Sequence, residues 1–367
     1  MSPLANLLTA CLLAGMSLGA AAERACPAIG AIRWDAWHGA SGPVGRHVQR
    51  TLGPERYHYR LPFCSRVLAA DKVEIECDSQ EVMDREIDYA ATAGLSYWIF
   101  STHPRADAMS RSFNFYLSSS KKDRVKFALG SRPRHMGGPG QYGEIQRFVE
   151  LMKDPSYQRV AGNRPLFFIG FLGKEIDQYW GGPAAFRTGV AELRAQAARA
   201  GLPNPYIVVM EFNPERAKEY ADTYGFDAIT TYATRAGQLG APYERLARGV
   251  EHYWDRSKAT GAQVLPIVMT GWDNRPKFDT PRRAKDDVGP VARKEFYYEQ
   301  GSPEEIAQHF ERAIRWVEAN PAATSANAIV VYAWNEHDEG GWLEPTVSEG
   351  PARVEAVGRA VSRACRR

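Results

Sequence analysis

The chain has 367 residues, of which 44% are apolar and 24% are charged, and its formal net charge at pH 7 is +3. This length and composition allow a large core, in one α/β barrel or in two domains. The 46 basic and 43 acidic residues are intermixed without a basic run, which argues against a nucleic-acid partner.

The N-terminal segment from Leu7 to Ala22 is apolar, carries no charge and ends on three alanines. It is short for a membrane span and has the small-residue ending of a secretory signal. We therefore expect a signal peptide at 1–22 and one mature domain at 23–367. The mature protein is then secreted or periplasmic in a bacterium, with no membrane span. A lipoprotein-type box ending at Cys11 is the alternative, but its apolar core follows the cysteine.

Removal of this signal leaves four cysteines: Cys26, Cys64, Cys77 and Cys365. An even number of cysteines in an exported chain predicts disulfides. Cys64 and Cys77 flank a predicted hairpin, so we expect them to pair with each other and Cys26 to pair with Cys365. Buried free thiols are the alternative. A metal site is disfavoured because no CxxC or HxxxH spacing accompanies the cysteines.

Eight short apolar runs alternate with amphipathic helical stretches along the chain. The predicted strands cover residues 28–34, 95–100, 126–130, 165–171, 206–211, 226–232, 264–270 and 328–334. The predicted helices cover residues 81–93, 111–121, 141–153, 184–200, 214–223, 242–259, 303–319 and 351–364. This alternation predicts an α/β fold, a single (β/α)8 TIM barrel with long βα loops. A doubly wound open sheet is the alternative, but no Gly-rich phosphate loop follows the first strand.

The residues that follow the strands of such a barrel gather at one mouth. Here they are polar and aromatic, as in carbohydrate sites, where rings stack on sugar C–H faces and polar groups bind hydroxyls. The predicted substrate-binding residues are Trp34, Asp35, His38, Glu211, Tyr232, Trp272, Asp273, Asn274, Trp334, Asn335, His337, Trp342 and Glu344. The mouth also receives Thr102, His103, Arg132, Arg134 and His135.

Some of these residues have structural alternatives. A lone histidine in the place of His38 is more often a structural hydrogen-bonding residue, and Glu211 is equally consistent with an ion pair to a barrel arginine. The segment from Trp272 to Asn274 lies in the sequence GWDNRP, whose residue types are also typical of a turn.

Two glutamates three residues apart, Glu336 and Glu339, follow the last predicted strand. On one helical turn such residues share a face, with Cβ atoms about 5–6 Å apart. Glycoside hydrolysis uses two carboxyl groups at such separations, one protonated as the acid and one ionised as base or nucleophile. Two close carboxylates also raise the pKa of one of them. We therefore predict that this pair is catalytic; a solvated acidic loop is the alternative.

Several segments, in this order, resemble the glycoside hydrolase family 99-like proteins, which include bacterial members linked to polysaccharide synthesis. The segments are MDREIDYAATAG at 83–94 with LSYWIF at 95–100, KFAL at 126–129, GWDNRP at 271–276, and WNEHDEG at 334–340 with LEP at 343–345. The resemblance covers about residues 28–346, and its last motif is the specific one.

This resemblance implies a (β/α)8 barrel with the activity of a retaining endo-α-mannosidase that needs no metal or other cofactor. In the family's motif the first glutamate, here Glu336, acts as base on the substrate's own 2-hydroxyl and gives an anhydrosugar. The second, here Glu339, is the general acid and then the base for water. The chain departs from the hydrolases between the two, where His337 and Asp338 replace Trp-His. This extra acid is expected to alter both carboxyl pKa values and the shape of the subsite.

We thus expect an exported hydrolase that cleaves internal, α-linked, mannose-like bonds of a polysaccharide or glycan. The alternative is a non-catalytic carbohydrate-binding protein of a polysaccharide export or modification system. A glycosyltransferase is disfavoured because the sequence has neither a nucleotide-binding Gly-rich turn nor an Asp-x-Asp metal motif. The sequence gives no signal for the oligomeric state.

Overall fold

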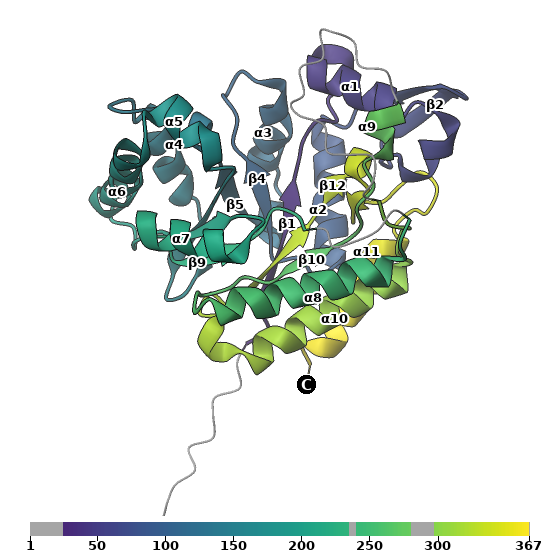
Figure 1. Cartoon of the computed structure of the whole chain (residues 1–367). Coiled ribbons are helices and arrows are strands. Elements are labelled where there is room, and N and C mark those ends of the chain that lie inside the picture. Colours follow the sequence, from purple (N-terminus) through teal and green to yellow (C-terminus); the bar gives the residue numbers. More distant parts are fainter. Residues whose placement is uncertain (1–24, 235–239, 280–296, 367) are drawn as a thin grey trace, which may run out of the picture.

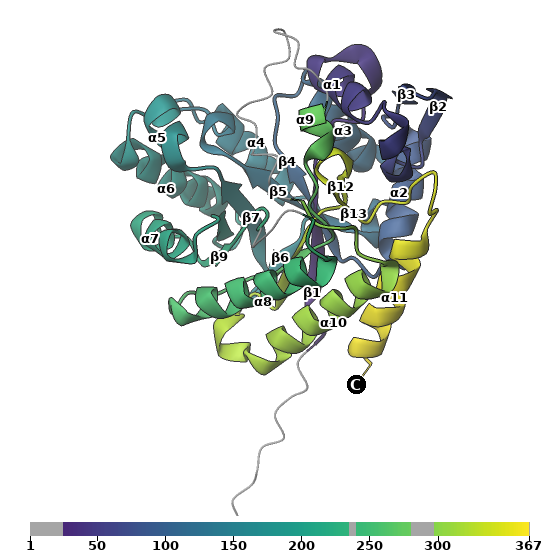
Figure 2. The ribbon, with the colours of Figure 1, turned by 45° about the vertical axis from the view of Figure 1, so that its right-hand side comes forward.

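The computed structural model describes residues 25–234, 240–279 and 297–366, so the predicted signal peptide at 1–22 lies outside the described residues. Eight parallel strands form a nearly closed barrel with helices around it (Figures 1 and 2). The strands are β1 (Ala28–Arg33), β4 (Tyr97–Ser101), β5 (Lys126–Ser131), β7 (Arg164–Gly170), β8 (Tyr206–Met210), β9 (Ala228–Thr230), β10 (Ile267–Met269) and β11 (Ala328–Tyr332). Their order is β10-β11-β1-β4-β5-β7-β8-β9, which confirms the predicted (β/α)8 barrel.

The barrel closes most weakly between β9 and β10. These barrel strands have three residues each, and an isolated bridge between Ile229 and Val264 links this side of the barrel. The sequence predicted longer strands here, at 226–232 and 264–270. Pro266 has no N–H to donate to a neighbouring strand, so the regular part of β10 begins only after it.

Helices follow each strand and cover the outside of the barrel. They are α2 (Gln80–Thr92), α3 (Arg111–Ser118), α4 (Gly143–Met152), α5 (Gly173–Trp180), α6 (Pro183–Arg199), α7 (Pro214–Tyr224), α8 (Tyr243–Ala259), α10 (Pro303–Ala319) and α11 (Ala352–Ala364). Two more, α1 (Pro43–Thr51) and α9 (Arg275–Asp279), contact each other at the mouth (Figures 1 and 2). The sequence did not predict α1, α5 or α9. No helix in the described ranges is both long and apolar enough to cross a membrane.

Local sequence explains where the predicted helices begin and end. Ser302 starts α10 with a capping box, because its hydroxyl accepts from the Glu305 N–H at 3.2 Å and the Glu305 carboxylate accepts from the Ser302 N–H at 2.9 Å. Asn213 caps α7 by accepting from the Arg216 N–H at 2.7 Å. The same helix ends at Gly225, whose φ of 72° is the left-handed conformation that glycine adopts without strain.

A long excursion after β1 builds a second, smaller core beside the barrel mouth. It contains α1 and the hairpin of β2 (Ser65–Ala69) and β3 (Lys72–Ile75). Its buried apolar residues include Trp37, Val48, Leu52, Tyr57 and Leu61.

Two disulfides join the expected pairs. One connects Cys64 to Cys77 across the base of this hairpin, and the other connects Cys26, just before β1, to Cys365 at the end of α11.

Candidate active site

A cavity of about 390 Å³ opens at the carboxyl ends of the barrel strands. Segments after all eight strands contribute to it. Its lining includes Trp34, Thr102, His103, Arg132, Arg134, His135, Phe171, Phe212, Tyr232, Trp272, Lys277, Glu336 and Glu339. This is the face on which TIM-barrel enzymes carry their active sites.

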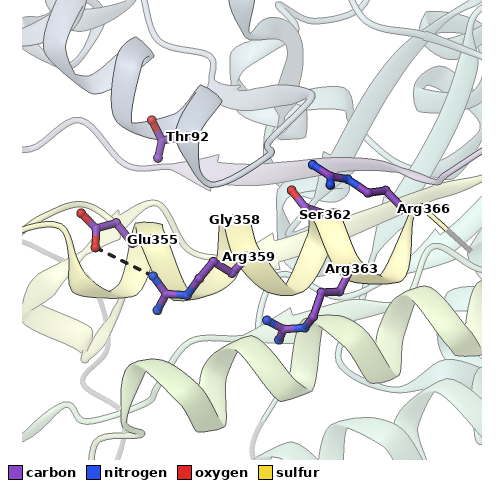
Figure 3. Close-up of a pocket in the computed structure, with 7 residues that line it drawn as sticks. All are labelled: Thr92, Glu355, Gly358, Arg359, Ser362, Arg363 and Arg366. Atoms are coloured by element: carbon purple, nitrogen blue, oxygen red, sulfur yellow. Dashed lines mark ion pairs between the residues drawn. The ribbon is translucent and has the colours of Figure 1, made fainter.

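A second hollow, of about 510 Å³, lies outside the barrel between α2 and α11 (Figure 3). Glycine at 358 allows this close packing, because a Cβ there would lie 2.1 Å from the Thr92 carbonyl oxygen. Its lining carboxylate, Glu355, is already paired with Arg359 at 4.0 Å (Figure 3). The hollow is larger than the barrel cavity, but it lacks a pair of carboxyl groups, so we place the candidate site in the barrel.

The run from Trp334 to Pro345 folds into a tight hairpin that places two glutamates at the cavity. Strand β12 (Asn335–Glu336) pairs with β13 (Gly341–Trp342), and one 3-10 turn, His337–Glu339, connects them. Gly340 ends the turn with a φ of 82°, and a Cβ there would lie 2.5 Å from the Asp273 amide nitrogen. Glycine is therefore required for this close approach.

Three side chains hold the two cavity glutamates. The Tyr232 hydroxyl donates to Glu336 Oε1. The Tyr332 hydroxyl donates to Glu339 Oε2 at 2.6 Å, and Lys277 Nζ donates to Glu339 Oε1 at 2.6 Å. Glu336 is bonded by a neutral hydroxyl, whereas Glu339 also has a cation.

A third carboxylate, Asp338, lies beside the pair and is fully buried. Lys277 Nζ is 3.2 Å from Asp338 Oδ2, and neither Asp338 oxygen accepts a hydrogen bond from the described residues. Lys277 is thus shared by two carboxylates. Burial acts to lower the pKa of the Lys277 ammonium. The charges of the two carboxylates and the hydrogen bond to Glu339 outweigh burial, so the pKa is raised.

The two glutamates have pKa values shifted in opposite directions. Burial raises the pKa of Glu336 well above its usual range, and the charges of Glu339 and Asp338 raise it further. Burial also acts to raise the pKa of Glu339, but the charge and hydrogen bond of Lys277, with the Tyr332 hydroxyl, outweigh it and lower the pKa. These opposite shifts favour the proton on Glu336 and the negative charge on Glu339. One protonated and one ionised carboxyl group are what acid–base chemistry at a sugar requires.

Three of the predicted substrate-binding residues lie at the cavity with the pair: Trp34, Tyr232 and Trp272. The Trp34 ring centroid is 5.5 Å from Lys277 Nζ. The rings of Tyr232 and Trp272 each lie 5.6 Å from that of Tyr332. Together these rings form an aromatic wall around the carboxyl groups.

Five predicted binding residues of the same run face the interior instead: Trp334, Asn335, His337, Trp342 and Glu344 are all buried away from the cavity. His337 Nε2 is 2.7 Å from Glu344 Oε2, and its ring stacks on Trp342 with centroids 5.5 Å apart. Trp334 Nε1 donates to a carboxylate oxygen of Glu86 at 2.8 Å. The two-residue strand β12 and the 3-10 turn send neighbouring side chains in opposite directions, which a helical spacing does not predict.

Asp273, Asn274 and Asp35 also lie outside the cavity lining. Asp273 is fully buried and accepts from Arg60 and, at 2.9 Å, from Arg275, so its carboxylate is already neutralised. Asp35 accepts from the Arg33 guanidinium at 2.8 Å. Asn274 is 5% exposed. Buried carboxylates need such partners, and these two fix the loops behind the cavity.

His38 and Glu211 both have local partners outside the cavity. His38 Nδ1 is 3.2 Å from the Ser41 hydroxyl, and the ring is buried outside the cavity lining. Glu211 lies 3.9 Å from Arg216 and also stays outside it.

Sequence reasoning missed Lys277 and Tyr332, the two side chains that contact Glu339. Lys277 stands on the unpredicted helix α9, directly after GWDNRP, a sequence that predicts only a binding or turn segment. Tyr332 lies in the last predicted strand, and its signal is the alternation of side chains along a strand, which turns it to the face opposite Val331. Among the described residues, no group of three or more His, Cys, Asp or Glu side chains is arranged to hold a metal ion.

Comparisons with known proteins agree with the barrel. A GH99 endo-α-mannosidase from Bacteroides thetaiotaomicron, solved with bis-tris-propane, is 16% identical and superposes with a TM-score of 0.55 over 92% of this chain and 96% of that chain. A glycoside hydrolase-like protein is 15% identical, with a TM-score of 0.58 over 94% and 97% of the two chains. At these identities the likeness shows the fold. No curated protein matches the sequence.

The family model described as glycosyltransferase WbsX matches residues 140–357, more than half of the chain. The matched part contains Lys277 and the cavity pair. With the GH99-like fold, this match confirms the resemblance inferred from the sequence motifs. The chain belongs to the WbsX family.

Proposed function

We propose that the protein is an exported glycoside hydrolase that cleaves internal, α-linked, mannose-like bonds of a polysaccharide or glycan with retention. The observation that carries the proposal is the cavity pair beside an aromatic wall, in which the pKa of Glu336 is raised and that of Glu339 is lowered. The mature chain, 23–367, is then one catalytic domain. The two disulfides support export, because such bonds persist in oxidising compartments.

Within the pair, Glu336 is proposed as the base on the substrate's 2-hydroxyl and Glu339 as the general acid, then as the base for water. The pKa shifts favour the reverse of these roles, because Lys277 lowers the pKa of Glu339 against the effect of burial. A proton must therefore move to Glu339 as the substrate binds and changes the solvation of both groups. If no such transfer occurs, Glu336 acts as the acid and Glu339 as the base.

The aromatic residues at the rim support a sugar ligand. Phe171 and Phe212 are 44% and 56% exposed, and both line the cavity. Exposed rings of this size stack on the apolar faces of sugars. With Trp34 and Trp272 they offer stacking positions on several sides of the cavity, as a chain-like ligand requires.

The first test measures reducing ends released from α-linked mannans and bacterial exopolysaccharides by the wild type and by Glu339→Ala. Product from the wild type alone supports the proposal. The exposed Glu318 on α10, changed to Gln, is the matched control and is expected to behave as wild type. Equal product from Glu339→Ala would overturn the role of the pair.

The same assay with aryl glycosides of the substrate identified above separates the two roles. A good leaving group needs no general acid. The variant that lacks the general acid, Glu339→Gln under the proposed roles, therefore recovers activity on the activated substrate. The variant that lacks the base, Glu336→Gln, does not. Recovery of Glu336→Gln would reverse the proposed roles.

Two alternative functions each have one observation in their favour. The ion pair between Lys277 and Glu339 favours a carbohydrate-binding protein without turnover, and such a protein binds a polymer but releases no reducing ends. The name of the family favours sugar transfer, which the same pair performs when an acceptor hydroxyl replaces water. Mass spectrometry of the products, with added oligosaccharide or nucleotide-sugar donors, detects transfer as chains longer than the substrate.

A further inference from the structure

A basic wall faces the same cavity from the loops after β4 and β5. It consists of His103, Arg132, Arg134 and His135, all of which line the cavity. Strand β5 is the third neighbour of β11 around the barrel, in the order β11, β1, β4, β5. The basic wall is therefore set apart from the carboxyl pair that follows β11.

The arginines of the basic wall outnumber their carboxylate partner. Arg132 Nε donates to Glu175 Oε2 at 3.1 Å, and Arg134 Nε lies 3.8 Å from Glu175 Oε1. One carboxylate against two guanidiniums leaves one positive charge in excess. The two arginine side chains are 29% and 40% exposed, so this excess charge can reach a ligand.

The two imidazoles add neutral hydrogen-bonding groups. Their ring centroids are 5.1 Å apart, and Arg134 Nε donates to His135 Nε2 at 3.1 Å, which requires this nitrogen to be unprotonated. Burial lowers the pKa of His135 to about 4, with the charges of His103 and the arginines acting in the same direction. Burial also lowers the pKa of His103, against the opposing charge of the exposed Asp107. No hydrogen bond to the His103 ring is found among the described residues.

Neighbouring residues hold the wall in place, one of them at the cavity rim. The Arg132 guanidinium lies 4.7 Å over the Phe171 ring, and Trp180 Nε1 donates to the Pro133 carbonyl oxygen at 2.9 Å. Arg147 donates to the His103 carbonyl oxygen at 3.1 Å. These contacts fix the loops before a ligand arrives, which favours binding.

We propose that the basic wall is a subsite for a uronic acid residue of the glycan that is cleaved at the carboxyl pair. The inference rests on the proposed function and names its substrate class. A guanidinium binds a carboxylate through charge-assisted hydrogen bonds, and a neutral sugar leaves the excess charge unmatched. Asp338 and Glu339 outnumber Lys277 on the other side, so an acidic sugar is attracted to the wall and repelled from the pair. This charge separation sets the direction of the chain in the cavity.

The experiment compares acidic and neutral forms of the same ligand. Oligosaccharides from glucuronic acid-containing bacterial polysaccharides, and the same samples with their carboxyl groups reduced to alcohols, are titrated by calorimetry into the wild type. We expect at least one acidic form to bind about tenfold more tightly than its reduced form. Arg134→Gln removes most of this preference, because it weakens binding of the acidic form far more than binding of the reduced form. Glu175→Gln, which frees both guanidiniums, increases the preference, a gain that a purely structural arginine pair does not produce.

Arg216→Gln is the matched control, because Arg216 is an exposed arginine after β8 that lies 3.9 Å from the Glu211 carboxylate. It is expected to bind both forms as wild type. Equal binding of acidic and reduced forms, absence of binding by any acidic form, or equal weakening of both forms in Arg134→Gln overturns the subsite. The preference for the acidic form is measured as binding, so it does not depend on turnover. If no polymer is hydrolysed, only the proposed function is overturned. Hydrolysis of neutral mannans without an acid preference overturns only the subsite.

Discussion

Two groups of carboxyl side chains lie close together in this barrel and have opposite surroundings. The cavity carboxyls, Glu336 and Glu339, each face the open cavity. The interior carboxyls, Glu86 and Glu344, are 2% and 1% exposed. Burial raises the pKa of Glu86 and of Glu344 to about 8, against the opposing charge of Arg33. Both groups thus contain strongly shifted carboxyls, and only one group can reach a substrate.

The interior carboxyls are saturated with fixed partners. Glu86 accepts from Arg33 at 3.0 Å and from Trp334 at 2.8 Å, and Glu344 lies 2.7 Å from His337. The cavity carboxyls are bonded on one side and line the cavity, although Glu336 is only 3% exposed. A raised pKa therefore shows only that a carboxyl group is buried. Access to the cavity shows which group can exchange a proton with a substrate. Perturbed pKa values alone do not separate catalytic from structural sites.

The largest expected difference between the groups is in turnover. Glu339→Gln is expected to lower the rate of reducing-end release by about 10²–10⁴-fold, because proton transfer is lost. Glu344→Gln keeps a side chain of the same shape in the interior and is expected to retain wild-type rates. Initial rates on the same substrate measure both. Equal losses in the two variants would mean that the interior carboxyls take part in the chemistry.

The next effect concerns stability. Arg33 is 2% exposed and is the cation that Asp35 and Glu86 share. Arg33→Met leaves these carboxyls buried without a cation and is expected to lower the free energy of unfolding by about 3–5 kcal/mol. Arg66→Met, which breaks the exposed pair with Glu74, is expected to cost at most about 1 kcal/mol. Urea unfolding followed by tryptophan fluorescence measures both, and equal costs would refute the interior network.

Much of the fold was predictable because its signals are local. The apolar runs that became β1 and β11 are continuous, as strands buried on both faces are, and Ser302 and Gly225 mark helix ends through their own backbone geometry. Strand β10 was shorter than predicted because Pro266 interrupts the hydrogen bonding. The short helix α9 has five residues, too few for an amphipathic period to be recognised.

The site was predictable only in part. Two acids three residues apart after a strand were enough to indicate Glu336 and Glu339. The inward direction of His337 and Glu344 was not predictable, because it depends on Glu86 and on Arg60, whose carbonyl oxygen is 2.7 Å from His337 Nδ1. These partners stand more than 200 residues earlier in the sequence. Local spacing carries no information about contacts of that range.

A smaller effect is expected in the pH dependence of stability. The folded pKa of Glu86 is about 8, above its ordinary value of 4.5, so between these values the folded state binds more protons than the unfolded state. The stabilising contribution is complete below about pH 4.5 and is lost as the pH rises through about 8. Glu86→Gln is expected to flatten the decline by up to about 1.4 kcal/mol per pH unit. Unfolding in urea at pH 5, 6, 7 and 8 measures the slope; Glu318→Gln should match wild type, and an unchanged slope in Glu86→Gln would contradict the assignment.

The smallest effect distinguishes a hydroxyl at the cavity from one in the core. Tyr332→Phe removes a hydrogen bond to Glu339 and is expected to lower kcat/KM about tenfold, because bonds to charged groups are the stronger ones. It also raises the pKa of Glu339, since the hydroxyl helps to lower it, so the limb of the pH–rate profile set by this group moves to higher pH. Tyr97→Phe is the matched control, because the Tyr97 hydroxyl donates to the Ile329 carbonyl oxygen at 3.3 Å inside the same barrel. Only a hydrogen bond to a titrating cavity carboxyl moves a pH–rate profile. An unchanged profile in Tyr332→Phe, or the same loss of rate in both variants, would therefore mean that the Tyr332 hydroxyl is a structural contact like that of Tyr97.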